Sequence, residues 1–277
     1  MGVVLLKRKL TSFQIIILGF SGVILFGTFL LMLPFSSRSG LATPFSDALF
    51  TSTSAVCVTG LIVHDTATYW SGFGQFVILL LIQIGGMGVI TVAASFAMIS
   101  GRKISLMQRS TMQEAISAPK VGGIVRLTGF IVRVTFVMEL LCAAVMAPVF
   151  CRDFGKIGLW MALFHSVSAF CNAGFDLLGV RTPFSSLTSY AANPVINFTI
   201  MFLIVFGGIG FLTWDDIRTN RLHLHKYRMQ SKVILCTTAV LLIVPAMYFY
   251  FFEFANLTRK ERLLSSLFQA VTPRTAG

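Results

Sequence analysis

Two very long runs without a charged side chain constrain this protein more than any other feature of its sequence. One run covers 36 residues, from Thr66 to Gly101, and the other covers 33 residues, from Thr182 to Trp214. A helix of about 20 apolar residues is enough to cross the hydrocarbon core of a bilayer. Only 12% of the 277 residues are charged and 56% are hydrophobic, against roughly 25% and 45–50% in soluble domains. These features predict an all-α polytopic membrane protein and exclude a water-soluble enzyme.

Five apolar runs are long enough to form membrane-spanning helices. They cover residues 13–34, 73–99, 129–150, 196–214 and 233–252. A shorter apolar stretch follows the first, third and fifth of these runs, at residues 44–56, 159–170 and 261–271. Stretches of this length are more typical of re-entrant or buried segments than of complete spans. We expect Thr43 with Pro44 to start the first short helix, and Thr258 with Glu261 to form a capping box at the third.

Three copies of one motif occur along the chain. Each copy begins with Leu-Phe and ends at a glycine, and the copies occupy residues 49–60, 163–174 and 267–277. A Gly-Gly-x-Gly motif follows each of the first two copies. Its glycines, predicted to lie in the pore wall, are Gly85, Gly86, Gly88, Gly207, Gly208 and Gly210. They lack the spacing of a dinucleotide-binding fingerprint, so close helix packing or a flexible point is favoured. The repeat unit is predicted to be a helix, a short segment ending in glycine, and a second helix.

Basic residues gather in three places and predict the orientation of the chain. The clusters are Lys7, Arg8 and Lys9, then Arg102, Lys103, Arg109, Lys120 and Arg126, and finally Arg218, Arg221, Lys226, Arg228 and Lys232. The positive-inside rule assigns them, and the N-terminus, to the cytoplasmic side. Both Gly-Gly-x-Gly helices then point the same way, so residues 159–174 must enter from outside and return. The repeats are therefore parallel, unlike the inverted repeats of many secondary transporters.

A re-entrant backbone leaves polar groups unpaired, which the membrane tolerates only inside protein or along a watery path. Cation filters use such carbonyls in place of the hydration shell of an ion. Glycine reaches the backbone angles that this arrangement needs. Helices entering from outside also point their partly negative C-termini at the pore centre. The predicted filter carbonyls belong to Val58, Thr59, Gly60, Asn172, Ala173, Gly174, Thr275, Ala276 and Gly277.

The filter segments resemble those of a known family. They read Val56-Cys57-Val58-Thr59-Gly60, Ser168-Ala169-Phe170-Cys171-Asn172-Ala173-Gly174 and Thr272-Pro273-Arg274-Thr275-Ala276-Gly277. They are similar to the first three pore loops of the Trk/Ktr/HKT superfamily of potassium transporters, whose pore-lining second helices resemble the Gly-Gly-x-Gly helices. Because the first repeat begins close to Met1, the chain is more similar to a Ktr-type membrane subunit than to the longer Trk-type one. The family fold has four repeats around a pseudo-fourfold pore, and two and a half are present here. We therefore expect a fragment or a truncated reading frame, inactive alone.

The resemblance implies potassium uptake across the inner (cytoplasmic) membrane, with no bound cofactor and no metal other than the transported K⁺. It also implies a homodimer in the lipid bilayer, governed by cytoplasmic nucleotide-binding regulatory subunits. The chain then divides into repeats and cytoplasmic basic loops. The repeats are residues 1–101, 127–214 and 233–277, and the loops, which are candidate docking faces, are residues 102–126 and 215–232. An arginine stands at the place of Arg274 in the family, and we expect Arg274 to point behind the filter and brace carbonyls or an acid.

Several residues outside the filter have two possible interpretations. Glu139 lies in the third span, where an acid can be functional or can join helices through hydrogen bonds. Asp215 and Asp216 with two histidines could suggest a metal site, but their position after a span favours a solvated cytoplasmic face. The five cysteines are scattered singly and predict neither a disulfide framework nor a structural metal site.

Three other functions are weighed against potassium uptake. A net charge of +12 would suggest nucleic-acid binding in a soluble chain, but in a membrane protein the location of the charge matters more than its sum. A secondary transporter of another cation or small solute would need polar side chains at the membrane midplane. A membrane-embedded enzyme would need paired acids or histidines within the spans, where Glu139 is the one candidate. No catalysed reaction is therefore predicted.

Overall fold

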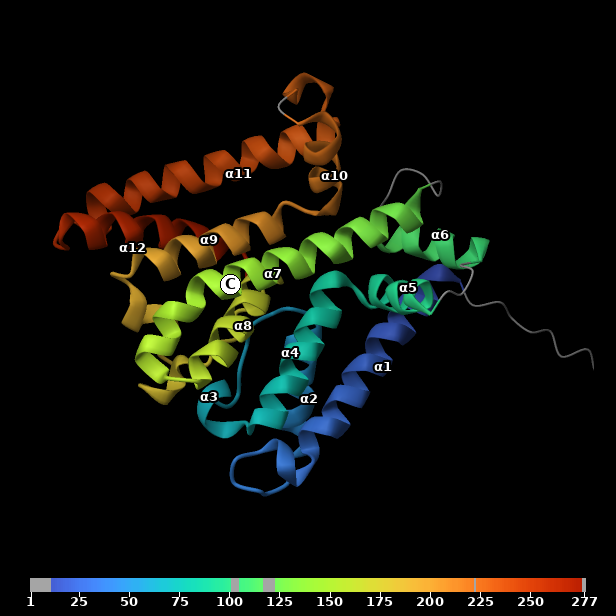
Figure 1. Ribbon diagram of the computed structural model, residues 1–277, viewed down its shortest axis with the longest axis horizontal. Helices are drawn as coiled ribbons and strands as arrows, with labels where there is room; N and C mark the ends of the chain where they lie inside the picture. Colours follow the sequence, from blue (N-terminus) through green and yellow to red (C-terminus); the bar gives the residue numbers. More distant parts are fainter. Residues whose placement is uncertain (1–10, 101–104, 117–122, 222, 276–277) are drawn as a thin grey trace, which may run out of the picture.

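The structure, a computed structural model, describes residues 11–100, 105–116, 123–221 and 223–275. These residues form helices and short helical turns, with an isolated β-bridge between Ser37 and Trp70 (Figure 1). Three described helices are long and apolar enough to cross a membrane by themselves. They are α1 (Ser12–Met32), α7 (Ile124–Phe154) and α11 (Met229–Tyr248), and α11 continues into a π-helical turn, η5 (Phe249–Glu253). The predicted all-α polytopic membrane architecture is confirmed.

The other two predicted spans are each broken by a bend of 94°. The halves are α4 (Gly72–Met87) and α5 (Val89–Ile99) in the first case, and α9 (Pro194–Gly208) and α10 (Phe211–Asn220) in the second. The last glycine of each Gly-Gly-x-Gly motif lies near the bend, and Gly88 and Gly210 have φ values of +82° and +84°. Only glycine adopts such angles at little cost. The sequence predicted continuous helices, whereas the chain turns sideways after each motif (Figure 1).

Three short helices match the predicted re-entrant stretches. They are α2 (Phe45–Val56), α8 (Ile157–Phe170) and α12 (Arg259–Val271). Each packs against the long helix that precedes it, and α2 and α8 also pack against the second helix of their own repeat. The helix-plus-short-helix unit therefore occurs three times among the described residues.

The starts of two short helices differ from the sequence-based expectation. Thr43 does not cap α2, because Pro44 occupies the N-cap and the Thr43 hydroxyl accepts a hydrogen bond from Tyr69. Thr258 does occupy the N-cap of α12. Its hydroxyl donates to the Glu261 carboxylate at 2.6 Å instead of accepting from the backbone, so the predicted capping box is incomplete.

Short elements connect the longer helices at the two ends of the repeats. One end carries η1 (Pro34–Ser36), α3 (Thr66–Tyr69), η2 (Leu178–Val180) and η3 (Ser186–Tyr190), and the other carries α6 (Leu106–Ala115) and η4 (Leu224–Lys226). The segments predicted as basic loops, residues 102–126 and 215–232, are partly helical, because they contain α6 and parts of α7, α10 and α11. Their predicted cytoplasmic position stays a prediction.

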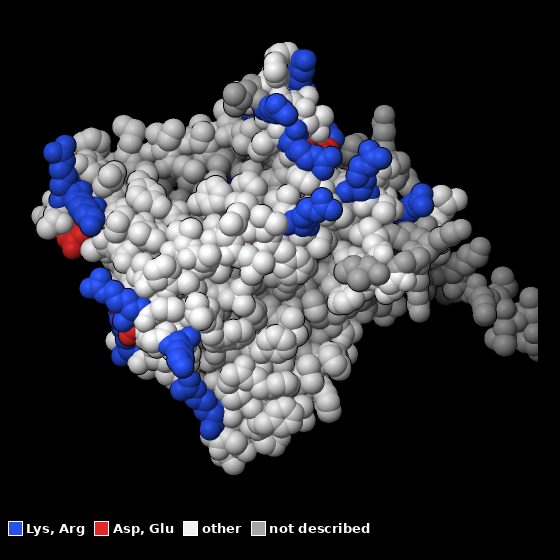
Figure 2. Space-filling model, viewed as in Figure 1, with Lys and Arg blue, Asp and Glu red and all other residues white. Residues whose placement is uncertain are grey.

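The surface carries an uncharged band. Lys and Arg side chains gather at opposite edges of the face in Figure 2 and leave a broad region without charge between them. Large apolar side chains are exposed on the long helices, among them Leu25, Phe26 and Phe29 of α1 and Leu140 and Leu141 of α7. Exposed apolar surface of this extent suits contact with lipid tails.

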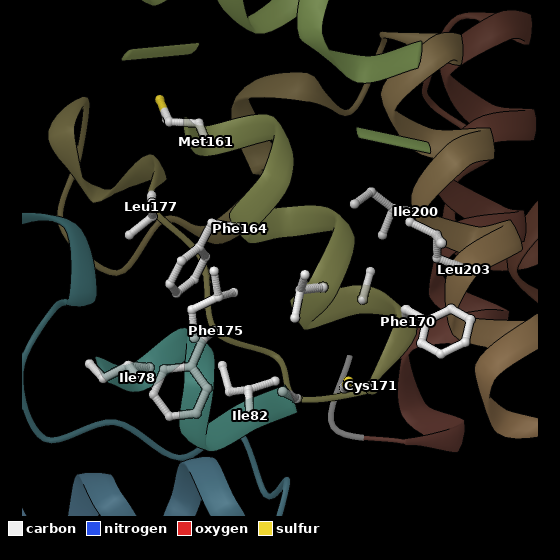
Figure 3. Close-up of a cluster of buried hydrophobic side chains, with 14 of the residues drawn as sticks. Ile78, Ile82, Met161, Phe164, Phe170, Cys171, Phe175, Leu177, Ile200 and Leu203 are labelled. Atoms are coloured by element: carbon white, nitrogen blue, oxygen red, sulfur yellow. The ribbon is translucent and has the colours of Figure 1, made fainter. Parts of the chain in front are cut away.

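The main core surrounds the second short helix, α8. Figure 3 shows Phe164 of α8 and Phe175 just after it, with Phe175 lying against Ile78 and Ile82 of α4. Leu203 of α9 belongs to the same buried cluster on the other side of α8. The core therefore holds the second predicted filter segment between the second helices of two consecutive repeats.

Candidate functional site

The first two predicted filter segments have the same unusual backbone conformation. Val58 and Gly60 in the first segment have φ values of +56° and +75°, and Asn172 and Gly174 in the second have +59° and +71°. A residue with negative φ separates the two in each segment. Positive φ in a residue other than glycine costs roughly 1–3 kcal/mol and persists only where the surroundings enforce it. Alternation between positive and negative φ can turn successive carbonyls toward one side, and a carbonyl-lined filter needs that arrangement.

Corresponding hydrogen bonds attach each of the two filter segments to the short helix that precedes it. The backbone N–H of Thr59 donates to the carbonyl of Ser54 at 2.9 Å, and that of Ala173 donates to the carbonyl of Ser168 at 2.8 Å. The hydroxyls of both serines also bind the segment, since Ser54 pairs with the Thr59 hydroxyl at 2.9 Å and Ser168 donates to the carbonyl of Phe175 at 2.6 Å. Each short helix thus ties down the filter segment that follows it.

Glycines allow each second helix to touch its own filter segment. A Cβ on Gly85 would overlap the carbonyl oxygen of Val56, and a Cβ on Gly207 would overlap that of Phe170. Val56 and Phe170 are the last residues of α2 and α8, at matching positions in the two repeats. The first glycine of each motif therefore serves close backbone packing, one of the two roles that the sequence favoured.

The second glycine of each motif faces the next repeat. A Cβ on Gly86 would come within 2.5 Å of the sulfur of Cys171, which follows α8. A Cβ on Gly208 would stand 3.9 Å from the amide of Asn172 and 4.0 Å from the methyl group of Thr275. Each second helix consequently separates its own filter segment from the next one, in an order that follows the chain.

Glu139 is buried behind the second filter segment. It is 2% exposed, and its backbone carbonyl accepts a hydrogen bond from the Ser166 hydroxyl at 2.7 Å. The first repeat has the same bond between the Ser52 hydroxyl and the carbonyl of Ile24, at 2.8 Å. The Glu139 carboxyl itself faces the thiol of Cys171, with Sγ and Oε1 4.0 Å apart. The serine contact is thus common to both repeats, whereas the acid belongs to the second.

His165 on α8 is a buried polar residue that the sequence analysis missed. Its Nδ1 lies 2.7 Å from the carbonyl of Met161, and its Nε2 lies 3.3 Å from the backbone N–H of Leu177. A carbonyl can only accept and an N–H can only donate, so the contacts fit a neutral imidazole with the proton on Nδ1. The ring thereby connects α8 to the chain that leaves the second filter segment. Its sequence signal was weak, because the matching residue of the first repeat is Thr51.

The third filter segment begins in a short turn, η6 (Thr272–Arg274). The guanidinium of Arg274 donates from Nη2 to the hydroxyl of Thr238 on α11 at 3.1 Å. The side chain therefore reaches a neighbouring helix and binds a hydroxyl there, whereas a carbonyl or an acid had been expected. Ala276 and Gly277, the last two predicted filter residues, lie outside the described residues.

A cavity of about 600 Å³ lies beside the ends of both Gly-Gly-x-Gly motifs. Its lining includes Gly88 and Gly210 at the two bends and the polar side chains of Thr91 and Thr213. Phe20 of α1 covers another part. The rest of the lining is mostly apolar, so the cavity joins a few polar side chains to a largely hydrophobic wall at the two bends.

The two acids near residue 220, Asp215 and Asp216, form a structural contact. Asp216 is 3% exposed, not solvated as the sequence suggested, and accepts from the backbone N–H of Arg228 at 3.1 Å and the Ser231 hydroxyl at 2.6 Å. Asp215 pairs with the Arg228 guanidinium at 2.9 Å. These contacts fasten α10 to the start of α11. Across the part of the chain that the structure describes, no group of three or more His, Cys, Asp or Glu could hold a metal ion.

Comparison with known proteins identifies relatives along nearly the whole chain. The family model described as cation transport protein, TrkH, matches residues 7–277. The potassium/sodium uptake protein NtpJ of Enterococcus hirae is 42% identical over 98% of this chain. The Ktr system potassium uptake protein B is 39% identical over 97% of this chain in Bacillus subtilis, and 36% identical over 98% in Vibrio alginolyticus.

The chain spans 60% of the length of each of these three relatives. The family match extends over the two Gly-Gly-x-Gly motifs and the three filter segments. These relatives are transport proteins and not enzymes, in agreement with the sequence analysis. The chain belongs to the TrkH family of cation transport proteins.

Proposed function

We propose that this chain forms part of a potassium uptake protein in which backbone carbonyls select the ion. The observation that carries the proposal is the shared backbone of the two filter segments, with positive φ at Val58 and Gly60 and again at Asn172 and Gly174. Two segments 114 positions apart would not adopt the same strained conformation without a common role. Carbonyls in such a segment can replace the water around a dehydrated cation.

The proposed filter also includes Thr59, Ala173 and the third segment, Thr275, Ala276 and Gly277. Its wall is formed by the glycines of α4 and α9. The helices α2, α8 and α12 add to the attraction for a cation, because the C-terminus of a helix carries partial negative charge. Arg274 is proposed to brace the third segment through Thr238, at a distance of 3.1 Å.

The complete transporter is proposed to contain four repeats around one pore. Cys171 is buried against Gly86 of the preceding repeat, whereas Cys57, at the matching position of the first segment, is exposed. A further second helix against Cys57 would cover it in the same way. The greater length of the relatives supports this proposal.

We propose a position in the cytoplasmic membrane, with the N-terminus and the basic segments 102–126 and 215–232 on the cytoplasmic side. The relatives named as parts of a Ktr system support an assembly with other components. We propose a homodimer with a nucleotide-binding regulatory subunit on the cytoplasmic face. Asp216 ties α10 to the start of α11, and the basic residues of these two helices are proposed to face that subunit.

The test is cation uptake by the whole four-repeat protein in cells without other potassium uptake systems. The wild type should take up K⁺ or Rb⁺ from a dilute medium and prefer K⁺ to Na⁺. Gly60→Ala adds a Cβ at a φ of +75°, so the preference should fall by about tenfold before membrane abundance does. Normal uptake with unchanged preference in this variant would remove Gly60 from the filter. Uptake of another solute in place of K⁺ would favour a secondary transporter.

A further inference from the structure

Asp65 joins the first repeat to the second on the side where the chain leaves the filter segments. Its side chain is buried, and Oδ1 accepts from the backbone N–H groups of Ala67 and Thr68 at 3.0 and 2.9 Å. These bonds cap the N-terminus of α3. The other oxygen, Oδ2, accepts from the backbone N–H of Phe184 at 3.0 Å, 119 residues further along the chain. One carboxylate thus serves both a local helix and a distant loop.

The contact surface opposite Asp65 is shaped to receive the carboxylate. A Cβ on Gly179 would overlap both carboxylate oxygens of Asp65. Asp65 follows Gly60 by five residues, and Gly179 follows Gly174 by five residues. The two residues therefore occupy the same position in consecutive repeats, and the glycine of the second repeat leaves room for the acid of the first.

The loop that binds Asp65 is held in an unfavourable conformation. Phe184 has a φ of +59° and Ser186 has a φ of +49°. Residues other than glycine rarely adopt such backbone angles. Such a conformation persists only where contacts enforce it. The hydrogen bond from the Phe184 N–H to Asp65 is a contact of this kind.

A second bond joins the same two repeats nearby. The indole N–H of Trp160 on α8 donates to Oε1 of Gln75 on α4 at 2.9 Å. The amide nitrogen of Gln75 donates in turn to the carbonyl of Trp70 at 3.2 Å. Gln75 lies near the start of α4, whereas the bend at Gly88 follows its end. The bond between Trp160 and Gln75 is therefore at the end of α4 away from the bend.

We propose that Asp65 is a positioning residue that sets the separation of the first and second filter segments. The proposal rests on the proposed potassium filter. Carbonyls from different segments must keep a fixed spacing to favour one ion size, and the segments themselves are short and strained. Asp65 connects the exit of the first segment to the exit of the second through Gly179 and Phe184, and it touches no ion.

The test compares three variants of the whole protein. Asp65→Ser retains an N-cap for α3, because serine caps helices well, but its shorter side chain cannot reach Phe184. Gly179→Ala introduces the overlap with Asp65. Asn193→Ser is the matched control, since the Asn193 side chain caps α9 by accepting from the backbone N–H of Ile196 at 3.2 Å, a bond that stays within the second repeat.

Asp65→Ser should lower the preference for K⁺ over Na⁺ at least fivefold while total cation uptake persists, and Asn193→Ser should leave the preference within twofold. Gly179→Ala alone should also lower the preference. In the double variant Asp65→Ser/Gly179→Ala the space left by the acid accommodates the methyl group, so its effect should not exceed that of Asp65→Ser. An unchanged preference in Asp65→Ser, or a double variant whose loss is the product of the two single losses, would overturn the proposal.

A measurement independent of transport separates the failure of this inference from failure of the proposed function. Hydrogen exchange of the Phe184 amide in purified protein should be at least tenfold faster in Asp65→Ser than in the wild type, with no change in Asn193→Ser. Equal exchange in Asp65→Ser and wild type would overturn the inference whatever the transport result. A wild type that fails to prefer K⁺ over Na⁺, with the expected change in exchange, would instead contradict the proposed filter.

Discussion

The thiol of Cys171 lies 4.0 Å from the carboxyl oxygen Oε1 of Glu139, in the middle of the second repeat. Cys171 directly follows α8 and contacts Gly86 of α4 on its other side. Glu139 is buried in α7, and its carboxyl also lies close to the side chain of Gln83 on α4. We therefore expect the acid to support packing behind the filter segment and to stand outside the ion path.

The Glu139→Gln variant should therefore transport normally. Glutamine keeps the shape and hydrogen-bonding ability of the side chain. The backbone carbonyl of residue 139, which accepts a hydrogen bond from the Ser166 hydroxyl at 2.7 Å, is unchanged. Uptake, normalised to membrane abundance, should stay close to wild type at every pH tested. A loss of more than about tenfold, equivalent to ~1.4 kcal/mol of barrier, would show that the ionised carboxylate attracts the cation or carries a proton.

Gly207→Ala should destabilise the second repeat. The added Cβ would overlap the carbonyl oxygen of Phe170, and overpacking of this kind costs about 1–3 kcal/mol. The matched control is Gly129→Ala on α7, where a Cβ would meet no atom within 4 Å. Thermal unfolding of the purified protein should show a lower Tm for Gly207→Ala and an unchanged or higher Tm for Gly129→Ala, since alanine favours helix. Equal Tm values would contradict the close packing of α9 against α8.

The sequence predicted the helices well because their evidence is local. Apolar runs predicted the long helices, and the three shorter apolar stretches predicted the short helices α2, α8 and α12. The glycine motifs favoured close helix packing or a flexible point, and Gly85 and Gly207 show close packing. The 94° bends could not be predicted, because a glycine permits a positive φ without requiring it.

Contacts between repeats could not be predicted from the sequence. The pairing of Asp65 with Phe184 depends on how two repeats lie relative to each other, and the repeat alignment alone does not give that. The burial of Asp216 was also missed, because its partners Arg228 and Ser231 become neighbours only when α11 folds back onto α10. An acid that follows a span in a basic region is usually solvated, so its local pattern pointed the other way.

Asp47, in the first turn of α2, should contribute a pH-dependent stability. A hydrogen bond with Nε2 of His64, at 2.8 Å, lowers the pKa of Asp47 below its ordinary value of 3.8. Because the folded-state pKa is the lower one, the contribution is present above pH 3.8 and is lost as the pH falls through the folded-state pKa. Asp47→Asn should lower Tm at pH 6, and its difference from wild type should shrink below pH 3.8. A difference that stays constant down to pH 2.5 would contradict this linkage.

The last prediction concerns the parallel orientation of the repeats. Ser189 in η3 and Gln108 in α6 are both exposed, and they lie at opposite ends of the repeat units. If α8 enters the membrane and returns, a cysteine at 189 should react with an impermeant thiol reagent added outside intact cells, and a cysteine at 108 should react only after the membrane is opened. The background must lack Cys57 and Cys236, whose exposed side chains would react themselves. If residues 159–174 crossed the membrane completely, 189 and 108 would lie on the same side, so identical labelling of the two positions would contradict both the re-entrant course of α8 and a filter built from parallel repeats.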